Sequence, residues 1–303
     1  MAKLSSKKPS TTHRCIIYGG PKSGKTQLAG ELSEHYNLIW VDMENGHETL
    51  FKLPQAYQDR IELVNLPDTR AYPIAIETVL KVIKGPVSIC EEHGKVGCML
   101  CKKEGKEFTE VNLSALDHNS VVVFDSLTQL SNSAISFITK NQPDDYKLNY
   151  DDWGNLGKLL DIFLSHIQQA KYNVIVISHE TEAETEGKKK TLVPVGGTRN
   201  FSRNVAKYFD HVIYAERKNK KHVFASSTQY ATNILTGSRT DVSLEGSDKP
   251  SLLAIFKPEL YRGNTAATSK VSNGNNKGSS STKTASPSKE SASSILDRLK
   301  KKK

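Results

Sequence analysis

The chain has 303 residues, of which 37% are hydrophobic, and its 42 Lys and Arg against 33 Asp and Glu residues give a formal net charge of +9. At about 150 residues per domain, this length predicts two domains, or one large α/β domain with additions. No apolar run approaches the ~20 residues that span a bilayer, and the basic N-terminus lacks the apolar stretch of a secretory signal, which excludes a membrane-spanning or secreted protein. Four unevenly spaced cysteines favour a reducing compartment over a disulfide scaffold, so we expect a cytoplasmic protein with no membrane partner.

Short β-branched runs alternate with helical patterns along the chain and predict an α/β fold with a mainly parallel sheet flanked by helices. The runs lie at 14–18, 38–42, 121–125 and 173–178. Continuous apolarity over this length is typical of strands that are covered on both faces. The helical patterns lie at 25–35, 73–84 and 152–171. Two later runs, 211–217 and 222–227, are joined by a short turn and predict an antiparallel pair.

A glycine-rich loop follows the first predicted strand and opens the first predicted helix. It consists of Gly19, Gly20, Pro21, Lys22, Ser23, Gly24, Lys25 and Thr26, and it fits the pattern G-x-x-x-x-G-K-[ST]. The glycines let backbone N–H groups curl around phosphate oxygens, and the helix N-terminus adds a favourable dipole. In this pattern Lys25 reaches the β- and γ-phosphates and the Thr26 hydroxyl ligates magnesium. The loop therefore predicts a site for ATP and Mg²⁺.

Polar residues at the ends of the other predicted strands are candidates for the rest of this site. Asp125 closes one strand and fits the second magnesium ligand, and Asp42, which closes another, is its rival. Glu44 lies just beyond Asp42, where it is placed to orient or deprotonate an attacking water. His179 follows the strand 173–178, where a polar side chain can sense the γ-phosphate and pass its presence to the following loop.

Residues 85–118 form a polar insertion between two predicted core elements. The insertion contains the pairs Cys90-x-x-His93 and Cys98-x-x-Cys101, four ligand-type residues within twelve positions. Two chelating pairs joined by a short Gly-containing turn suit one tetrahedral Zn²⁺. Because four protein ligands fill all four positions, we expect a structural zinc ion that folds an insertion with no core of its own.

The order of these parts resembles the RecA-like ATPase core. A phosphate loop, a strand ending in D-x-E, a strand ending in Asp-Ser and a strand ending in a polar sensor follow one another, and a Gly196-Gly197 pair and a helix with the aromatic end Lys207-Tyr208-Phe209 come next. The resemblance covers roughly residues 12–257. The chain is most similar to phage-encoded RecA-core ATPases, a group that includes single-strand annealing and recombination proteins, which implies the cytoplasm of a bacterial host.

The resemblance implies roles for the residues around the nucleotide. Glu44 would be the catalytic carboxylate and Asp125 the acid that organises magnesium, and Lys25 and His179 would complete the catalytic set. In this class ATP lies between the subunits of a homo-oligomeric ring or filament, and the neighbouring subunit contributes a cation that stabilises charge on the γ-phosphate. The candidates for that cation are Arg199, Arg203, Lys218, Lys220 and Arg239.

The resemblance also implies two loops that face DNA. The first is 140–152, where Lys147 and Tyr150 supply a charge and a stacking face, the usual combination for binding single strands. The second is 180–197, in which Lys188, Lys189 and Lys190 stand among several acids.

The basic charge of the chain lies mainly at its two ends. Residues 265–303 contain nine Lys and Arg and two acids, a net +7, and residues 1–14 add +4, so 15–264 carries 9 − 7 − 4 = −2. Ser, Thr, Asn, Gly and Lys dominate 265–294, which predicts a disordered tail that is either a solubilising segment or a docking site for a partner protein. We therefore expect a flexible N-terminus over 1–13, an ATPase core over 14–264 and a basic tail over 265–303.

These observations predict a RecA-like ATPase that acts on single-stranded DNA in recombination or strand annealing. A ring helicase or helicase-loading ATPase is the first alternative, because His179 stands where many recombinases carry Gln and ring helicases of the same core can carry His. A nucleotide-dependent DNA-binding scaffold with little turnover is the second.

Overall fold

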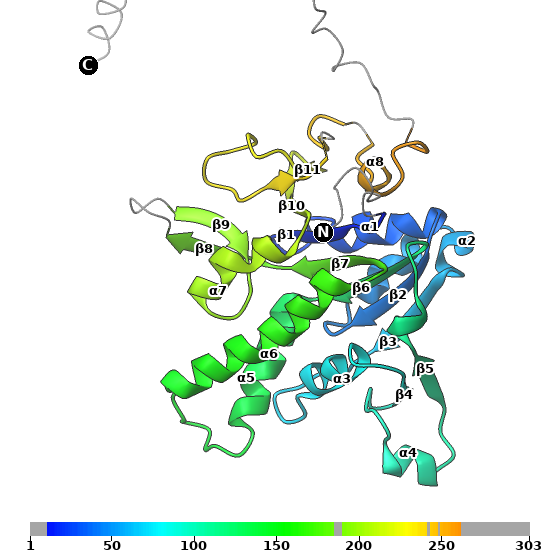
Figure 1. Cartoon of the computed structure of the whole chain (residues 1–303), viewed down its shortest axis with the longest axis vertical. Helices are drawn as coiled ribbons and strands as arrows, with labels where there is room; N and C mark the ends of the chain where they lie inside the picture. Colours follow the sequence, from blue (N-terminus) through cyan, green and yellow to red (C-terminus); the bar gives the residue numbers. More distant parts are fainter. Residues whose placement is uncertain (1–10, 185–189, 241–242, 248, 262–303) are drawn as a thin grey trace, which may run out of the picture. The chain divides into compact units, whose positions relative to one another are not determined.

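The computed structural model describes residues 11–184, 190–240, 243–247 and 249–261. In this part of the chain an eight-stranded sheet carries helices on both faces (Figure 1). Its strands follow the order β11-β10-β1-β7-β6-β2-β3, and β12 pairs with β10. All neighbours from β10 to β3 are parallel, whereas β11 and β12 run antiparallel to β10. The mainly parallel sheet and the antiparallel pair at its end were both predicted correctly.

The strands of this sheet match the apolar runs of the sequence closely. They are β1 (Arg14–Gly19), β2 (Asn37–Asp42), β3 (Ile61–Asn65), β6 (Ser120–Asp125), β7 (Asn173–Ser178), β10 (His211–Lys218), β11 (Lys221–Ala225) and β12 (Gly237–Ser238). Two further antiparallel pairs stand apart from the sheet. They are β4 (Val87–Cys90) with β5 (Phe108–Val111), and β8 (Glu180–Glu184) with β9 (Lys190–Pro194).

The helices include three long ones and several short ones. The α-helices are α1 (Lys25–Gly30), α2 (Gln55–Gln58), α3 (Ile74–Val82), α4 (Met99–Lys103), α5 (Leu127–Thr139), α6 (Tyr150–Gln169), α7 (Arg199–Asn204) and α8 (Leu253–Phe256). Single turns of 3-10 helix cover Glu31–Glu34, Gly46–Lys52, Leu113–Ala115 and Val205–Tyr208. Within the described residues, no helix combines the length and the apolarity that a membrane crossing requires.

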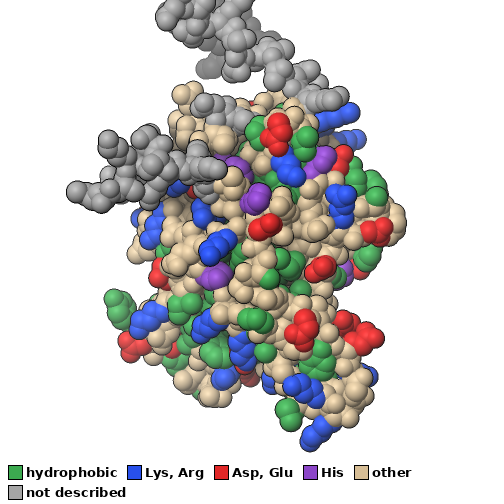
Figure 2. All heavy atoms as spheres, turned by 45° about the vertical axis from the view of Figure 1, so that its right-hand side comes forward, with side chains coloured by type: hydrophobic (Ala, Val, Ile, Leu, Met, Phe, Trp, Pro, Cys, Tyr) green, Lys and Arg blue, Asp and Glu red, His purple; other side chains and the backbone are tan. Residues whose placement is uncertain are grey.

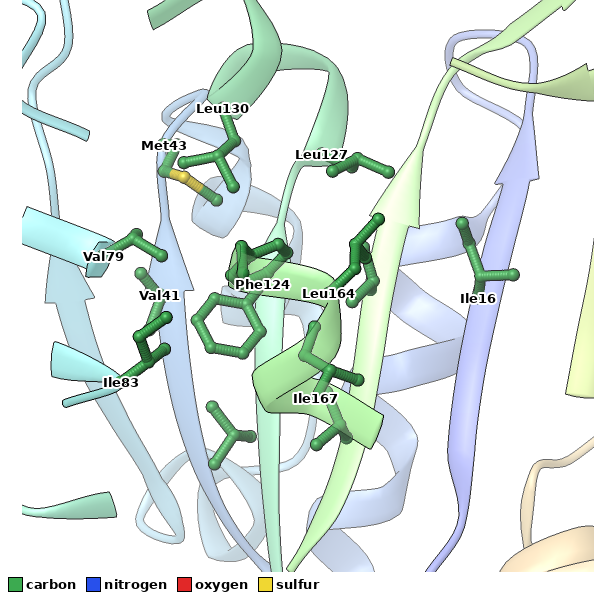
Figure 3. Close-up of a cluster of buried hydrophobic side chains, with 14 of the residues drawn as sticks. Ile16, Val41, Met43, Val79, Ile83, Phe124, Leu127, Leu130, Leu164 and Ile167 are labelled. Atoms are coloured by element: carbon green, nitrogen blue, oxygen red, sulfur yellow. The ribbon is translucent and has the colours of Figure 1, made fainter. Parts of the chain in front are cut away.

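Alternate residues of the central strands build a separate core on each face of the sheet. On one face Ile16, Val41 and Phe124 pack against α3, α5 and α6 (Figure 3). On the opposite face Trp40 and Val123 belong to a second cluster with the side chains of α1 and α8. Because both faces are covered, each central strand is apolar on both sides and reads as a continuous apolar run.

Helix α6 shows how local sequence fixes an element against this sheet. Asn149 caps its N-terminus and forms a capping box with Asp152, which satisfies backbone groups that the first turn leaves free. Leu156, Leu160, Phe163, Leu164 and Ile167 then form the buried stripe that the three-and-four spacing predicts. The Phe163 ring meets the Phe124 ring of β6 edge-on, with 5.0 Å between centroids.

The parallel order of the strands brings their carboxyl ends to one edge of the sheet. The phosphate loop follows β1, Asp42 and Asp125 are the last residues of β2 and β6, and Ser178 is the last residue of β7. Ligands of open α/β sheets bind at this edge. The predicted site residues therefore converge although they are far apart in the sequence.

Candidate active site and metal centre

The phosphate loop depends on two glycines that no other residue can replace without distortion. Gly19 has φ +150°, and a Cβ there would lie 1.9 Å from the carbonyl oxygen of Ala215 in β10. Gly24 has φ +94°, and a Cβ there would lie 2.9 Å from Cγ of His222 in β11. The loop is thus packed directly against two strands of the sheet, which holds its backbone in place for binding phosphate.

Lys25 lies inside the loop and is almost fully buried, with 7% of its surface exposed. Its Nζ donates hydrogen bonds to the carbonyl oxygens of Gly19 at 2.9 Å and Gly20 at 2.8 Å. Burial lowers the pKa of Lys25, while the nearby carboxylates Asp125, Glu44 and Glu180 act to raise it. A cation held in this way is oriented toward the phosphates that the loop is built to bind.

Thr26 and Asp125 form the pair of oxygen ligands that a magnesium ion at this loop requires. The Thr26 hydroxyl donates to Oδ2 of Asp125 at 3.2 Å, and Asp125 is buried. Burial raises the pKa of Asp125 to about 7, and the negative charges of Glu44 and Asp42 add to the effect. A hydroxyl and a carboxylate in this crowded anionic setting fit Mg²⁺, because hard cations prefer oxygen ligands and a cation would relieve the repulsion.

Asp42, the alternative candidate for the magnesium ligand, already accepts hydrogen bonds from the turn that follows it. Its Oδ1 accepts hydrogen bonds from the backbone N–H groups of Glu44 at 3.0 Å and Gly46 at 3.1 Å, and its Oδ2 accepts the N–H of His47 at 3.0 Å and contacts Nδ1 of His47 at 2.5 Å. Asp42 is fully buried. The geometry therefore gives the magnesium position to Asp125, and Asp42 orders the turn that carries Glu44.

Glu44 is held from two sides at the end of β2. The Ser126 hydroxyl donates a short hydrogen bond to Oε1 of Glu44, and Nε2 of His179 lies 3.4 Å from Oε2. Burial acts to raise the pKa of Glu44, but the bonds from His179 and Ser126 and the charge of Lys25 outweigh burial, so the pKa lies below its usual value. With 27% of its side chain exposed, Glu44 is an ionised carboxylate open to water, as a general base must be.

A cavity of about 350 Å³ opens beside the phosphate loop, between α1 and β11. Gln27 and Leu28 of α1 form one wall, and His222 and Phe224 of β11 form the other. Its lining combines apolar side chains with a few polar ones, which is typical of a small-molecule subsite. The sequence did not reveal this cavity, because its walls come from segments almost 200 positions apart.

The candidate cations for a neighbouring active site differ in how firmly they are held within their own chain. Lys218 pairs with Glu216 at 2.6 Å, and Arg239 pairs with Asp210 at 2.8 Å. Arg199 and Arg203, on α7, are exposed and form no ion pair within the described residues. Lys220, in the turn between β10 and β11, is exposed as well.

The candidate DNA contacts lie on two separate elements. Lys147 is exposed in the connection between α5 and α6, and Tyr150 begins α6 with 90% of its surface exposed. Lys190 begins β9 and pairs with Glu182 of β8 at 3.0 Å, and Lys188 and Lys189 lie outside the described residues. On the face that Figure 2 shows, acidic and basic side chains are interspersed.

The four ligand-type residues of the insertion come together as predicted. The ligand atoms of Cys90, His93, Cys98 and Cys101 all lie within 4.8 Å of one another, and Nδ1 of His93 is 3.1 Å from Sγ of Cys101. Bond lengths of about 2.3 Å for Zn–S and 2.0–2.1 Å for Zn–N place tetrahedral ligands at comparable separations. The three cysteines are buried, and a hydrogen bond from the Cys101 backbone lowers the pKa of Cys98 to about 7, which favours the metal-binding thiolate.

These observations define the class of protein: a P-loop ATPase in which the loop, a candidate magnesium pair of Thr and Asp and a candidate catalytic carboxylate share one edge of a parallel sheet. The family described as an AAA domain matches residues 11–240, and the chain belongs to it. The predicted ATPase class is thereby confirmed, while the closer similarity to phage-encoded recombination ATPases stays a prediction.

Among solved structures, the chain is similar to the protein described as a prototypical ATPase from the type III secretion system of pathogenic bacteria, at 16% identity and a TM-score of 0.37. That similarity covers 68% of this chain and 52% of the other, so the chain spans about half the length of that protein. No curated protein matches the chain.

Proposed function

We propose that this ATPase acts on single-stranded DNA, in recombination or strand annealing. The observation that carries the proposal is the connection between the nucleotide site and the β8–β9 hairpin. His179 contacts the catalytic candidate Glu44 and is followed at once by β8, which begins at Glu180. A change at the γ-phosphate that moves His179 would therefore reach the hairpin through a single peptide bond.

The base of the hairpin is tied to the same strand end on both sides. The backbone N–H of Val195, just after β9, donates to the carbonyl oxygen of His179 at 2.9 Å. The Ser178 hydroxyl donates to the carbonyl oxygen of Val195 at 3.0 Å. Strand β8 thus begins and β9 ends beside Ser178 and His179, which supports a hairpin whose position follows the state of the nucleotide.

The residues of the site divide the chemistry among them. Lys25 would bind the β- and γ-phosphates, and Thr26 and Asp125 would hold magnesium, which when bound neutralises charge on the phosphate oxygens. Glu44, oriented by Ser126 and His179, would accept a proton from the attacking water. Arg199, Arg203 or Lys220 of a neighbouring subunit in a ring or filament would supply the cation in trans, because none of the three forms an ion pair within the described residues.

The cavity between α1 and β11 would hold the nucleoside. It adjoins Gly24 of the loop, so a nucleotide whose phosphates lie on the loop places its base and sugar beside Gln27, Leu28 and His222. The insertion would bind one structural zinc ion through its four ligands.

Steady-state ATP hydrolysis with and without single-stranded DNA tests the proposal, with Lys25→Ala as the inactive control. We expect turnover that single-stranded DNA increases, together with faster pairing of complementary strands when ATP is present. A rate of ATP hydrolysis that single-stranded DNA does not change would contradict the proposal. Unwinding of a duplex without annealing would favour the ring-helicase alternative, and DNA binding with negligible turnover would favour a nucleotide-dependent scaffold.

A further inference from the structure

One carboxylate outside the nucleotide site is bound from three directions. Asp68 lies in the connection between β3 and α3. Its Oδ1 accepts hydrogen bonds from the backbone N–H of Ala75 at 2.9 Å and from the Ser133 hydroxyl at 2.8 Å. Its Oδ2 accepts a hydrogen bond from Nε2 of Gln129 at 2.8 Å. Asp68 therefore joins the start of α3 to the first half of α5.

Gln129 continues this connection to the catalytic carboxylate. Its backbone N–H donates to Oγ of Ser126 at 3.2 Å, where Ser126 caps the N-terminus of α5. The same Ser126 hydroxyl donates to Oε1 of Glu44. Gln129 thus bonds Asp68 through its side chain and Ser126 through its backbone, so the first turn of α5 connects Asp68 to the partner of Glu44.

The position of the Ser126 hydroxyl decides where Glu44 points. Glu44 follows a strand end and remains partly exposed, so its carboxylate is oriented by its partners, Ser126 and His179. A hydroxyl orients a carboxylate best when its own second bond is fixed, and here that bond comes from the backbone N–H of Gln129 in the first turn of α5. Asp68 holds this part of α5 in place through the Gln129 side chain and the Ser133 hydroxyl.

The connection between β3 and α3, which carries Asp68, packs against the insertion on its other side. Gly94, next to the ligand His93, has φ +62°, and a Cβ there would lie 3.0 Å from Cδ of Pro67 and 3.1 Å from Cα of Leu66. The carbonyl oxygen of Gly94 accepts a hydrogen bond from the Thr78 hydroxyl of α3 at 2.8 Å. The turn that holds a metal ligand is therefore in direct contact with the residue before Asp68.

A groove of about 810 Å³ separates the rest of the insertion from the same connection. One wall is formed by residues of the connection, including Pro67 and Tyr72, and the other by the metal-ligand candidates His93 and Cys98. The turn at Gly94 contacts Pro67 and bonds Thr78 of α3, so a shift of the insertion acts directly on the connection that carries Asp68 and on the helix that follows it.

We propose that Asp68 and Gln129 are positioning residues for Glu44, and that the metal-binding insertion controls the rate of ATP hydrolysis through them. The proposal rests on the proposed role of Glu44 in hydrolysis. Neither residue touches the nucleotide loop, so both act on turnover and not on nucleotide binding.

An exchange of hydrogen-bonding groups tests the first half of the proposal. Asp68→Asn places an amide nitrogen against the Gln129 amide, and Gln129→Glu places a carboxylate against Asp68. Each single variant should lower kcat about 10-fold, as changes to an orienting partner typically do, and leave the affinity for a fluorescent ATP analogue within about 2-fold. In D68N/Q129E the amide of residue 68 donates to the carboxylate of residue 129, so the hydrogen bond between the two side chains is restored in the opposite direction. Oδ1 of residue 68 still accepts the bonds from Ala75 and Ser133, and kcat should therefore recover.

Matched controls are available for these variants at exposed positions. Asp59→Asn and Gln169→Glu make the same chemical changes at exposed positions away from Asp68, Gln129 and Glu44 and should leave kcat unchanged. Failure of D68N/Q129E to recover kcat, with both single variants folded and binding nucleotide, would overturn the proposal. So would single variants with the wild-type kcat.

Removal of the metal tests the second half. Zinc-free protein, prepared with a zinc-selective chelator and assayed in excess Mg²⁺, should lose kcat about 10-fold with little change in nucleotide affinity. In Q129E the bond that ties α5 to Asp68 is already lost, so zinc removal should cause little further loss, because effects that act through one path do not multiply. Equal fold losses in both backgrounds would overturn the proposed control by the insertion. A wild-type protein that does not hydrolyse ATP would instead contradict the proposed function itself.

Discussion

Four carboxylates lie around Lys25 and Thr26, and for three of them the surroundings decide the role. Asp42 is fully buried and surrounded by N–H donors, so it serves as a structural anchor for the turn after β2. Asp125 is buried beside a hydroxyl and other negative charges, which makes it a site for a cation. Of these three, Glu44 combines ionisation with access to water. The same functional group would thus suit three different tasks because its environment differs.

Glu44→Gln should keep ATP binding and lower turnover by roughly 10²–10⁴-fold, the usual scale for the loss of a general base. The amide keeps the shape and still accepts the Ser126 hydrogen bond, so the loss reports on the proton acceptor. Phosphate release and binding of a fluorescent ATP analogue, measured on the same preparation, separate the two effects. The exposed Glu48 provides the control variant Glu48→Gln, which should behave as wild type, and an unchanged rate in E44Q would move the catalytic role to another acid.

For individual residues, the sequence was sufficient to predict the candidate site where the site is formed by a contiguous motif. The phosphate loop, Thr26 and the four metal-ligand candidates could be assigned because their spacing alone implies their geometry. Gln129 and Asp68 could not be assigned, because their hydrogen bond joins positions that are 61 residues apart. The role of Asp42 was equally hidden, since a strand-end acid that binds backbone N–H groups looks the same in sequence as one that binds magnesium.

Among the elements, the insertion is the one least able to fold by packing. Its two ends join the main core through Ile89, Val111 and Leu113, but Cys90, Cys98 and Cys101 form a separate cluster with Phe108 against it. Met99 and Leu100 of α4 are 66% and 55% exposed. Metal binding would therefore supply most of the free energy that folds the part of the insertion between β4 and β5.

Purified protein should carry about one zinc ion per chain by elemental analysis, bound by the four ligands of the insertion. Cys98→Ser with Cys101→Ser should lose the metal and make 85–118 sensitive to protease, because no apolar core replaces the ion. Cys15→Ser is the matched control, since Cys15 is buried in β1 away from the insertion, and it should keep the metal. If protein prepared without a chelator holds no zinc and its thiols titrate freely, the predicted zinc site in the insertion is wrong.

Strand β10 begins with a buried histidine that links it to the residue before β1. His211 is 1% exposed, its Nδ1 lies 2.8 Å from the Ser238 hydroxyl, and its Nε2 lies 3.2 Å from Nδ1 of His13. Burial lowers the pKa of His211 to about 4, with a smaller contribution from the charge of His13. The unfolded chain therefore takes up a proton on this residue at a higher pH than the folded protein does.

Stability should consequently fall as the pH decreases from about 6.5 to about 4, by up to roughly 3 kcal/mol from this residue. His211→Gln removes the titrating group and should flatten that part of the pH dependence, although its stability at pH 7 is lower. Urea denaturation at several pH values between 7 and 4 measures the difference, and the exposed His118 provides the control His118→Gln. An H211Q variant with the wild-type pH slope would assign the acid sensitivity to other groups.

Among the elements that the sequence did not predict, β3 and α5 belong to the central sheet and its covering layer, and each was missed for a physical reason. Strand β3 lies at the edge of the sheet, so Glu62 and Leu63 are exposed and no continuous apolar run marks it. Helix α5 buries Ser131 and Ser133 among its apolar residues, and the Ser131 hydroxyl bonds the carbonyl oxygen of Leu127 within the helix. Serine in a buried stripe interrupts the apolar periodicity that identifies a helix. The covered strands and α6 had no such interruption and were predicted correctly.

At the scale of the whole molecule, the distribution of charge determines how much the ATPase core and the termini each contribute to the binding of a polyanion such as DNA. Residues 15–264 carry a net −2, and the sequence beyond them carries +7 over 265–303, a segment outside the described residues. The candidate loop around Lys147 also contains Asp144, Asp145, Asp151 and Asp152. Non-specific attraction to DNA therefore belongs mainly to the termini, and specific contacts belong to local groups on the core.

Binding to single-stranded DNA should accordingly weaken steeply with salt, with each phosphate contact contributing a slope of about −0.7 on a log–log plot. Deletion of 265–303 should reduce the slope and the affinity, because nine cations leave with the segment. The ATPase site lies entirely on the core, so hydrolysis without DNA should be unchanged.

Fluorescence anisotropy of a labelled oligo-dT, titrated with full-length and truncated protein at several salt concentrations, separates the two contributions. Lys147→Ala in the truncated protein should weaken the remaining binding further and lower the slope by less than one, since it removes a single contact. Asp145→Ala, two positions away and exposed, is the matched control and should not weaken binding, because it removes a negative charge. Loss of all DNA binding on truncation would mean that the core contributes no contacts, and the DNA-facing roles of the 140–152 loop and the β8–β9 hairpin would then be wrong.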